Sequence, residues 1–299
     1  PLRNFIPEIQ RGIIEAGGIP VVFPVMSLGE DLMKPSAMLY RNMLSMEVEE
    51  YLRSYPIDGV VLLANCDKSV PGSLMGAIST DLPTIMFTAG ARPVAEFRGK
   101  PIGTGTDLWR MWSDYRAKKI SEETWKEFEG CLNCGLGSCN TMGTASSVAM
   151  MVEALGLTLP GTSVIPENNP ARKVAAFNSG REIVKMVNNQ VSPSKILTPA
   201  AFRNAMRVLH ACGGSTNAII HLLAISGRIE GGLTLGAINE LGAGLAVIAD
   251  VEPSGAKLIQ DFNQAGGLPA LIANCGENFE LDERTLIGKS WREIVKDVS

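Results

Sequence analysis

Three consecutive residues, Cys66, Asp67 and Lys68, place a thiol, a carboxylate and an amine side by side. They directly follow an apolar run that predicts a strand, so they would lie at the carboxyl end of a parallel sheet, where ligands bind in such folds. The alternative is an ordinary strand-to-helix turn in which Asp67 caps the next helix and Lys68 is solvated, because polar loops of this kind are common. The residue types themselves suit metal binding.

A second stretch contains Cys131, Cys134 and Cys139 within nine residues, among glycines that allow the backbone to fold tightly around a bound group. We expect Cys139 to lie at the start of a helix, where the N-terminus favours the thiolate that a metal needs. Zinc is the weaker interpretation of Cys131 and Cys134. A zinc site would need a second cysteine pair or a histidine pair nearby, and the two histidines of the chain are far away in sequence.

Two further stretches supply oxygen and amide groups. Glu30 and Asp31 follow an expected strand, and carboxylates that meet Asp67 at one sheet edge would suit Mg²⁺. The alternative for both is helix capping. The segment Gly213–Asn217 could line a site for a polyhydroxylated ligand, or it could form only the N-cap of the following helix.

Other familiar chemistries do not fit the sequence. The segment Gly103–Leu108 lacks the third glycine of a dinucleotide-binding fingerprint and does not follow an expected strand. The chain has neither a Walker A sequence nor a Gly-x-Ser-x-Gly elbow. Its two histidines disfavour a Ser-His-Asp hydrolase.

Strands and helices alternate in the first half of the chain and must position these residues. We expect helices over residues 5–17, 35–56 and 73–79, the second with Met43 and Met46 on its apolar face. Buried strands are expected over residues 19–25, 59–64 and 84–89. Strand, helix and strand in short succession imply parallel pairing. We therefore expect an α/β fold with three layers, α/β/α, around a mainly parallel sheet whose carboxyl edge holds the site.

The rest of the chain is expected to be mostly helical. Residues 90–135 form a polar and aromatic excursion toward a ligand or a subunit contact, with a helix that starts at Ser121. Further helices are expected over residues 141–155, 171–188, 198–211 and 218–225, with a short strand over residues 245–249. Val174 is expected to face inward on the second of these helices.

Composition narrows the class of protein. Hydrophobic residues make up 45% of the 299 residues and charged residues 19%, which excludes a disordered chain. The apolar runs are too short to span a bilayer, so no membrane partner is expected. A net charge of −4 provides no basic field for nucleic acid. With no secretory leader and six cysteines, too few for a disulfide scaffold, we expect a cytoplasmic protein.

Five ordered motifs, taken together, resemble the dihydroxy-acid and sugar-acid dehydratase family, which includes the 6-phosphogluconate enzymes. They are residues 66–76 and 137–146, which match the two cysteine motifs, and residues 213–217, 252–255 and 265–270. Residues 27–30 and 107–125 look more like the pentonate (arabinonate and xylonate) dehydratases than the branched-chain enzyme.

The resemblance implies a [2Fe-2S] cluster on three cysteines, with Mg²⁺ beside it. Cys66 and Cys139 match two of the cysteines, and the third belongs immediately upstream of this chain. The Mg²⁺ ligands match Glu30, Asp67 and Lys68, the lysine being carbamylated in relatives. The general base is a serine in a C-terminal domain. Residues 1–299 are therefore expected to be the N-terminal iron-sulfur and Mg²⁺ domain, truncated at both ends and inactive alone.

The implied activity is that of a hydro-lyase that converts a 2,3-dihydroxy carboxylate, such as a pentonate, to a 2-keto-3-deoxy acid by Lewis-acid catalysis. Two alternatives stay open: the dihydroxy-acid dehydratase of branched-chain amino-acid biosynthesis, and a non-catalytic fragment that binds a cluster or dimerises through Trp109, Trp112 and Tyr115. We expect a homo-oligomer, a dimer or tetramer. We also expect Cys66 and Cys139 to meet at one sheet edge.

Overall fold

A short parallel sheet lies at the centre of the protein. The computed structural model describes three stretches of the chain, residues 2–29, 33–132 and 134–298. The sheet consists of β1 (Val60–Leu63) and β2 (Thr84–Phe87), with Val60 opposite Thr84. Helix α3 (Ser69–Thr80) connects the two strands, because parallel neighbours need a crossover. The expected α/β class and both of these strands are confirmed.

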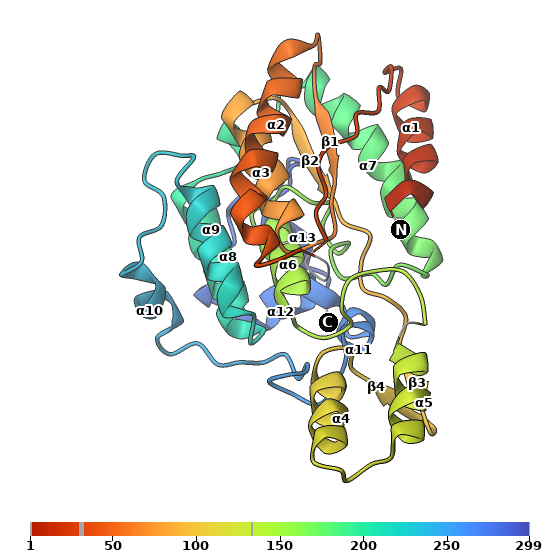
Figure 1. Ribbon diagram of the computed structural model, residues 1–299. Helices are drawn as coiled ribbons and strands as arrows, with labels where there is room; N and C mark the ends of the chain where they lie inside the picture. Colours follow the sequence, from red (N-terminus) through yellow and green to blue (C-terminus); the bar gives the residue numbers. More distant parts are fainter. Residues whose placement is uncertain (1, 30–32, 133, 299) are drawn as a thin grey trace.

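Helices cover both faces of this sheet. All four residues of β2 are buried, which is typical of a parallel strand between helical layers. Helix α3 and helix α7 (Pro170–Asn188) each contact both strands. In Figure 1 they lie on opposite sides of the sheet, with α2 (Arg41–Ser54) packed on α3 and α1 (Ile6–Glu15) packed on α7. In the described residues this layering extends over two strands.

The second half of the chain is a group of helices around the buried helix α6 (Thr144–Ala154). The others are α8 (Pro199–Ala211), α9 (Thr216–Ser226), α10 (Ala237–Gly242), α11 (Ile259–Gln264), α12 (Gly267–Cys275) and α13 (Trp291–Val295). Short 3-10 helices cover Leu2–Asn4, Ala37–Tyr40, Pro193–Lys195 and Gly276–Asn278. Side chains of Asn169, Thr198 and Ser215 accept backbone N–H groups at the starts of α7, α8 and α9, which explains where these helices begin.

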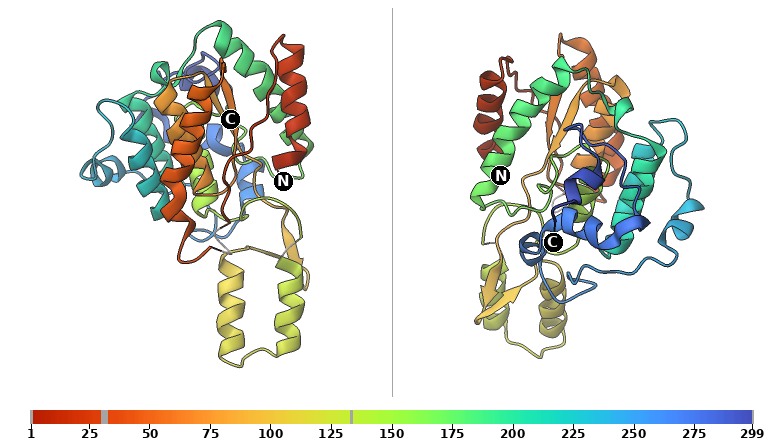
Figure 2. Two further views of the ribbon diagram at one scale, coloured as in Figure 1. Left: turned by 45° about the horizontal axis from the view of Figure 1, so that its top comes forward. Right: turned by 180° about the vertical axis from the view of Figure 1, so that it is seen from behind.

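A helical hairpin projects from the body of the molecule, as Figures 1 and 2 show. It contains the antiparallel strands β3 (Ala95–Phe97) and β4 (Lys100–Ile102) and the helices α4 (Thr106–Arg116) and α5 (Glu122–Leu132). We call residues 95–132 the hairpin arm. Its small core surrounds Phe128, which is fully buried. The expected excursion is confirmed, and so is the helix start at Ser121, whose hydroxyl accepts the Thr124 N–H at 3.2 Å.

The expected strand over residues 19–25 is wrong. These residues belong to no strand, and the side chain of Ile19 is 90% exposed. Pro20 and Pro24 remove two backbone donors from the ladder that this segment would have to form. The expected strand over residues 245–249 is also absent, because the N–H groups of Ile248 and Ala249 donate to the carbonyl of Ala211 instead.

Two helices differ in detail from the expectation. The helix expected from residue 35 begins as a 3-10 helix and becomes α2 only at Arg41, with Met43 and Met46 facing solvent. Val174, expected to point inward, is exposed on α7. In the described part of the chain, no helix is both long and apolar enough to cross a membrane.

Candidate functional site

The side chain of Asn65, the residue before Cys66, joins the segments that follow β1 and β2. Asn65 follows β1, and its side-chain amide donates to the carbonyl of Gly90 at 3.2 Å. Its Oδ1 accepts the N–H of Gly90 at 3.1 Å. Because Asn65 uses both ends of its amide on one residue, the position of the Cys66 loop is fixed relative to the segment after β2.

The second cysteine loop meets the same glycine. The N–H of Ser138 donates to the carbonyl of Gly90 at 3.0 Å, and the N–H of Arg92 donates to the carbonyl of Ser138 at 2.9 Å. Asn65 and Ser138 are the residues immediately before Cys66 and Cys139. The structure therefore brings both cysteine loops to one residue, and we call this arrangement the Gly90 hub.

Close backbone approach makes glycine necessary at two positions of the hub. Gly90 has φ +85, and a Cβ there would lie 2.0 Å from the carbonyl oxygen of Ile165. Gly137 has φ +131, and a Cβ there would lie 2.3 Å from the backbone nitrogen of Arg92. Both backbones are in a region that other residues rarely adopt. Sequence reasoning included Gly137 in the cysteine motif and missed Gly90.

The buried side chain of Arg172 bonds backbone segments that pack against Gly90. Arg172 is 1% exposed, and its guanidinium donates to the carbonyls of Thr88, at 3.0 Å, and Ile165. Burial lowers the pKa of Arg172, and the carboxylates of Glu153 and Glu167 oppose this effect. Burial likewise raises the pKa of Glu153, while N–H groups of the 161–163 turn stabilise its charged form.

Asp67 lies between the other two side chains of the first motif. The thiol of Cys66 donates to Asp67 Oδ1 at 3.0 Å, and Lys68 Nζ lies 2.5 Å from Asp67 Oδ2. The Asp67 and Lys68 side chains are mostly buried, so the interpretation of Lys68 as a solvated surface residue is wrong. Burial raises the pKa of Cys66 to about 11, with a further contribution from the Asp67 carboxylate. The thiol is therefore protonated at neutral pH in this arrangement.

Cys139 does not lie at a helix start, which corrects the expectation from the sequence. Helix α6 begins at Thr144, and Cys139 is exposed in the loop five residues earlier. The neighbouring Asn140 is fully buried and anchors this loop to the arm, because its Oδ1 accepts the N–H of Thr104 at 2.8 Å and the Thr104 hydroxyl at 2.9 Å. The glycine-rich sequence suggested an earlier helix than the backbone forms.

The other four cysteines have different surroundings. Cys131 packs against the small core of the hairpin arm, and the exposed Cys134 donates to the carbonyl of Pro93 at 3.2 Å. Cys212 and Cys275 are buried, and burial raises the pKa of both thiols, that of Cys212 to about 12. For Cys212 and Cys275 this is the environment of a thiol in apolar packing.

The donors expected for iron and Mg²⁺ fit these groups in kind. Cys66 and Cys139 supply thiols, and Asp67 supplies a carboxylate. Among the described residues, no three His, Cys, Asp or Glu side chains are placed so that they could hold one ion. Glu30 and Asp31 lie outside the described residues. The ligand role of Cys66, Cys139, Asp67 and Lys68 therefore stays a prediction.

The stretch Gly213–Asn217 forms the N-terminal cap of α9. Ser215 Oγ accepts the N–H of Asn217 at 3.3 Å and lies 2.8 Å from the hydroxyl of Thr144. The capping interpretation of this stretch is therefore confirmed. The Ser215–Thr144 contact also joins the starts of α6 and α9 next to the loop that bears Cys139.

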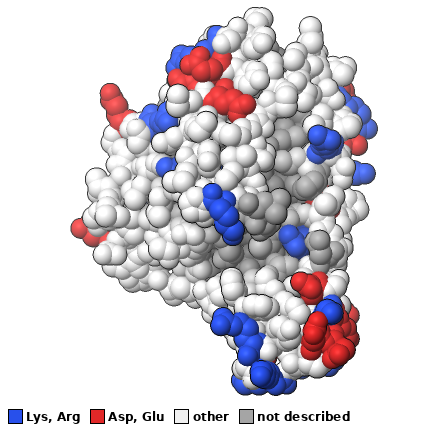
Figure 3. Space-filling view, viewed as in Figure 1, with Lys and Arg blue, Asp and Glu red and all other residues white. Residues whose placement is uncertain are grey.

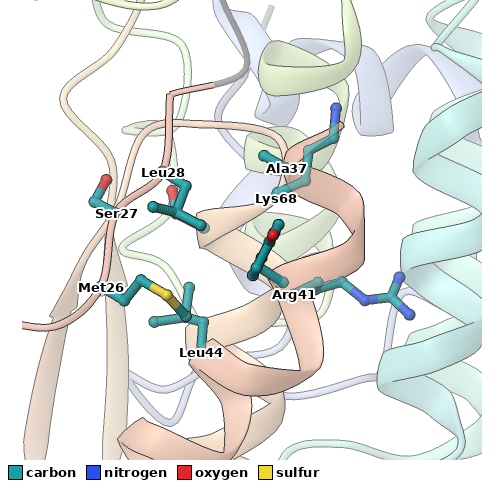
Figure 4. A pocket seen from close by; sticks show the side chains of 9 residues that line it. Met26, Ser27, Leu28, Ala37, Arg41, Leu44 and Lys68 are labelled. Carbon is teal, nitrogen blue, oxygen red and sulfur yellow. The ribbon is translucent and has the colours of Figure 1, made fainter. Parts of the chain in front are cut away.

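A histidine that seemed remote in sequence lies close to the first motif. His221, on α9, is 2% exposed, and its Nδ1 is 3.1 Å from a guanidinium nitrogen of Arg41. Figure 4 shows Arg41 extending from α2 toward the neighbouring helices, away from the Lys68 side chain. Arg41 and Lys68 line the same small pocket, together with residues 26–28. Nothing in the local sequence could have revealed this contact, because the two helices are far apart along the chain.

Burial of His221 predicts a pH-dependent stability. Burial, and next the charge of Arg41, lower the pKa of His221 to about 4, with Lys68 acting in the same direction and Asp67 against it. The unfolded chain therefore binds the proton more tightly, and the free energy of unfolding should fall as the pH falls from about 6.5 toward 4. We expect this group to contribute a loss of up to about 3 kcal/mol.

The measurement is urea unfolding at a series of pH values between 7 and 4.5. His221→Gln keeps a hydrogen-bond acceptor for Arg41 but does not titrate, so it should flatten the pH dependence relative to the unaltered protein. The matched control is His210→Gln, which should leave the dependence unchanged. His210 bonds the carbonyl of Ile238, away from Arg41. Equal pH dependence in the unaltered protein and His221→Gln would contradict the prediction.

Comparison with known proteins identifies the family. Residues 1–294 match the dihydroxy-acid/6-phosphogluconate dehydratase N-terminal family. The chain belongs to this family, and the resemblance drawn from its motifs is confirmed.

Three relatives show the range of named activities. L-arabonate dehydratase of Azospirillum brasilense is 46% identical over 298 residues, 6-deoxy-6-sulfo-D-gluconate dehydratase of Pseudomonas putida is 43% identical over 296 residues, and dihydroxy-acid dehydratase of Methanobrevibacter smithii is 35% identical over 303 residues. Each match covers 99% of this chain, and 51%, 51% and 55% of the respective relative. The chain thus spans about half the length of the curated relatives it matches.

Proposed function

We propose that the protein is a hydro-lyase that removes water from a 2,3-dihydroxy carboxylate to give a 2-keto-3-deoxy acid. The observation that carries this proposal is the Gly90 hub, where the residues before Cys66 and Cys139 bond one glycine. The Asp67–Lys68 pair follows the first of these cysteines directly. The reaction removes a proton from C2 and hydroxide from C3, and the resulting enol tautomerises to the ketone.

The proposed substrate is a sugar acid such as a pentonate. Support comes from two relatives at 43–46% identity that are named for sugar-acid substrates. A second candidate is the dehydration of a branched-chain dihydroxy acid, because a relative at 35% identity is named dihydroxy-acid dehydratase. The larger identity favours the sugar acid.

The proposed cofactors are a [2Fe-2S] cluster and Mg²⁺. Cys66 and Cys139 would hold iron together with a third thiolate from outside these residues, and Asp67, Lys68 and Glu30 would hold Mg²⁺. Lewis acidity is the chemistry that these groups supply, because it stabilises a departing hydroxide and the negative charge left when C2 loses its proton. The base that accepts this proton is proposed to lie in the half of the relatives that this chain does not span.

Lys68 must change its charge to serve as a metal ligand. As an ammonium it neutralises the carboxylate of Asp67 at 2.5 Å and so competes with a cation for that oxygen. Reaction of the neutral amine with carbon dioxide forms an N–C bond and releases one proton, which leaves a carbamate anion. Two anionic groups then face the cation, and oxygen donors of this kind are the ligands that Mg²⁺ prefers.

Substitution of Lys68 by arginine tests this role. The guanidinium cannot form the carbamate and keeps a cation beside Asp67, so we expect Mg²⁺ to bind at least about tenfold more weakly, or about 1.4 kcal/mol. Calorimetric titration with Mg²⁺ in bicarbonate buffer measures the affinity, and ¹³C NMR with labelled bicarbonate detects the carbamate. The matched control is Lys126→Arg, which alters an exposed lysine that pairs with Glu122 at 2.7 Å. Unchanged Mg²⁺ affinity in Lys68→Arg would exclude Lys68 as a ligand.

The proposed activity is tested on the full-length protein after anaerobic reconstitution with iron, sulfide and Mg²⁺. We expect 2-keto acid formation from L-arabinonate with kcat/KM at least about tenfold above that for 2,3-dihydroxyisovalerate, a difference in transition-state binding of about 1.4 kcal/mol. The reverse preference would support the branched-chain reaction. Turnover of neither acid by a protein that contains iron would support a non-catalytic domain.

The remaining expectations are part of the same proposal. Residues 1–299 would be the N-terminal, cofactor-binding domain of a homo-oligomeric cytoplasmic enzyme. The sheet of the complete protein would be a larger, mainly parallel sheet in three α/β/α layers. Helices cover both faces of β1 and β2, which supports three layers. In the part of the chain that the structure describes, β1 pairs only with β2 and lines a cavity of about 460 Å³ together with residues 19–23, which leaves room beside the sheet.

A further inference from the structure

We propose that the outer surface of the hairpin arm binds a second copy of this chain. The arm projects from the body, so its helices α4 and α5 offer their outer sides to a partner (Figure 2). Trp109 on α4 is 69% exposed, and Trp112, one turn later, is 37% exposed. Large aromatic side chains are enriched at the buried centres of protein interfaces and are costly to leave in water.

The aromatic side chains of the arm form a preorganised surface. The Trp112 ring lies 5.2 Å from that of Trp125, and the Trp125 ring lies 5.7 Å from that of Tyr115 in a stacked arrangement. These contacts join α4 to α5 and hold the rings in place before any partner binds. A surface of fixed aromatic rings loses little side-chain entropy on association.

Opposite net charges divide between the two halves of the arm, residues 106–120 and residues 121–132. Residues 106–120, which are α4 and the following turn, carry four basic and two acidic residues. Residues 121–132, which are essentially α5, carry four acidic residues and one basic residue. Figure 3 shows this separation, with Lys and Arg gathered on the α4 side of the arm and Asp and Glu on the α5 side.

This charge pattern favours a second copy over an unrelated partner. In a two-fold contact each copy presents the same surface. When α4 of the first copy faces α5 of the second, symmetry also makes α4 of the second face α5 of the first. In both halves of the interface, the net positive residues 106–120 of one copy then meet the net negative residues 121–132 of the other. The exposed Trp109 and Trp112 belong to the first of these segments. The exposed ion pairs within the arm, such as Lys126 with Glu122, contribute little to stability and can exchange partners across the contact.

The inference locates the surface of the homo-oligomer included in the proposed function, but it does not depend on catalysis. The test measures the molecular mass of the assembly and not its activity. A protein that assembles through the arm without any dehydratase activity would therefore refute only the proposed reaction. A dehydratase whose mass is insensitive to changes in the arm would refute only the present inference.

Charge reversal on the full chain provides the experiment. One variant carries Arg116→Glu, Lys118→Glu and Lys119→Glu, which makes both helices acidic. A second carries Glu122→Lys and Glu123→Lys, which changes the net charge of residues 121–132 from −3 to +1, so that both segments are net positive. We expect sedimentation velocity to show a dimer or larger assembly for the unaltered protein and at least about tenfold weaker association for each variant alone, because like charges then face each other.

A mixture of the two variants is the decisive measurement. It should restore the assembly as a mixed species, because the net negative segments of one variant then face the net positive segments of the other. This rescue would show that both variants are folded. Trp109→Ala should also weaken association, whereas Lys185→Glu on the exposed side of α7 should not. A monomeric unaltered protein, or variants that all keep the unaltered mass, would overturn the proposal and indicate that the arm contacts a different protein or another part of its own chain.

Discussion

Serine in place of Cys66 or Cys139 is expected to remove iron from the full-length protein, while serine at Cys131 or Cys134 is expected to leave it in place. Both expected ligands follow residues that bond Gly90, whereas Cys131 packs in the core of the hairpin arm and Cys134 bonds the carbonyl of Pro93. A serine hydroxyl is a far weaker ligand for iron than a thiolate. Loss of one of three thiolates should therefore prevent stable reconstitution.

The measurement is the amount of iron and sulfide per chain after anaerobic reconstitution. Visible absorbance is an independent measure of the cluster content. The double variant Cys131→Ser/Cys134→Ser is the matched control, because it changes two thiols of the same loop region and should keep the iron content of the unaltered protein. Iron loss in this control comparable to that of Cys139→Ser would show that the wrong thiols had been selected.

The strand ends and the chemistry that follows them could be predicted from sequence because the signals are local. Residues 60–63 are a continuous apolar run and residues 84–87 are apolar after Thr84, and both stretches are strands of the sheet. Thr198 and Ser215 are also local signals. Each has a side-chain hydroxyl and precedes an apolar run, and each is the N-cap of its helix, as its residue type predicted.

Features that depend on partners distant in sequence could not be predicted. Residues 19–25 have the composition of a buried strand, but a strand also needs a neighbour to bond, and this segment bonds none within the described residues. Met43 and Met46 have the composition of a core-facing helix, yet α2 turns Leu44 and Val48 toward α3 instead. Periodicity gives an apolar stripe, but packing decides which neighbouring side chains enter the core.

The residues that organise the candidate site show the same limit. Cys66, Asp67 and Lys68 were recognisable as a group from their types. Gly90 was not, because it stands outside every motif and its role comes from hydrogen bonds to Asn65 and Ser138, which are 25 and 48 residues away in sequence. His221 and Arg41, 180 residues apart, are a second example.

Alanine at Gly90 is therefore expected to have the largest effect of any conservative substitution in the site. The left-handed backbone at φ +85 costs an alanine about 1–2 kcal/mol. A Cβ 2.0 Å from the carbonyl of Ile165 must also displace backbone, which typically adds about 1–3 kcal/mol. The total loss in the free energy of unfolding should be about 2–5 kcal/mol. Any displacement of this backbone would also disturb the bonds to both cysteine loops.

The matched control is Gly99→Ala in the hairpin arm. Gly99 also has a left-handed backbone, at φ +76, but no atom lies within 4 Å of the position of its Cβ. Its substitution should cost only the backbone preference of about 1–2 kcal/mol and leave iron content unchanged. Urea unfolding of both variants gives the difference in stability, and iron content after reconstitution gives the effect on the loops. If Gly90→Ala is no less stable than Gly99→Ala and retains its iron, then the Gly90 hub does not hold the two cysteine loops together.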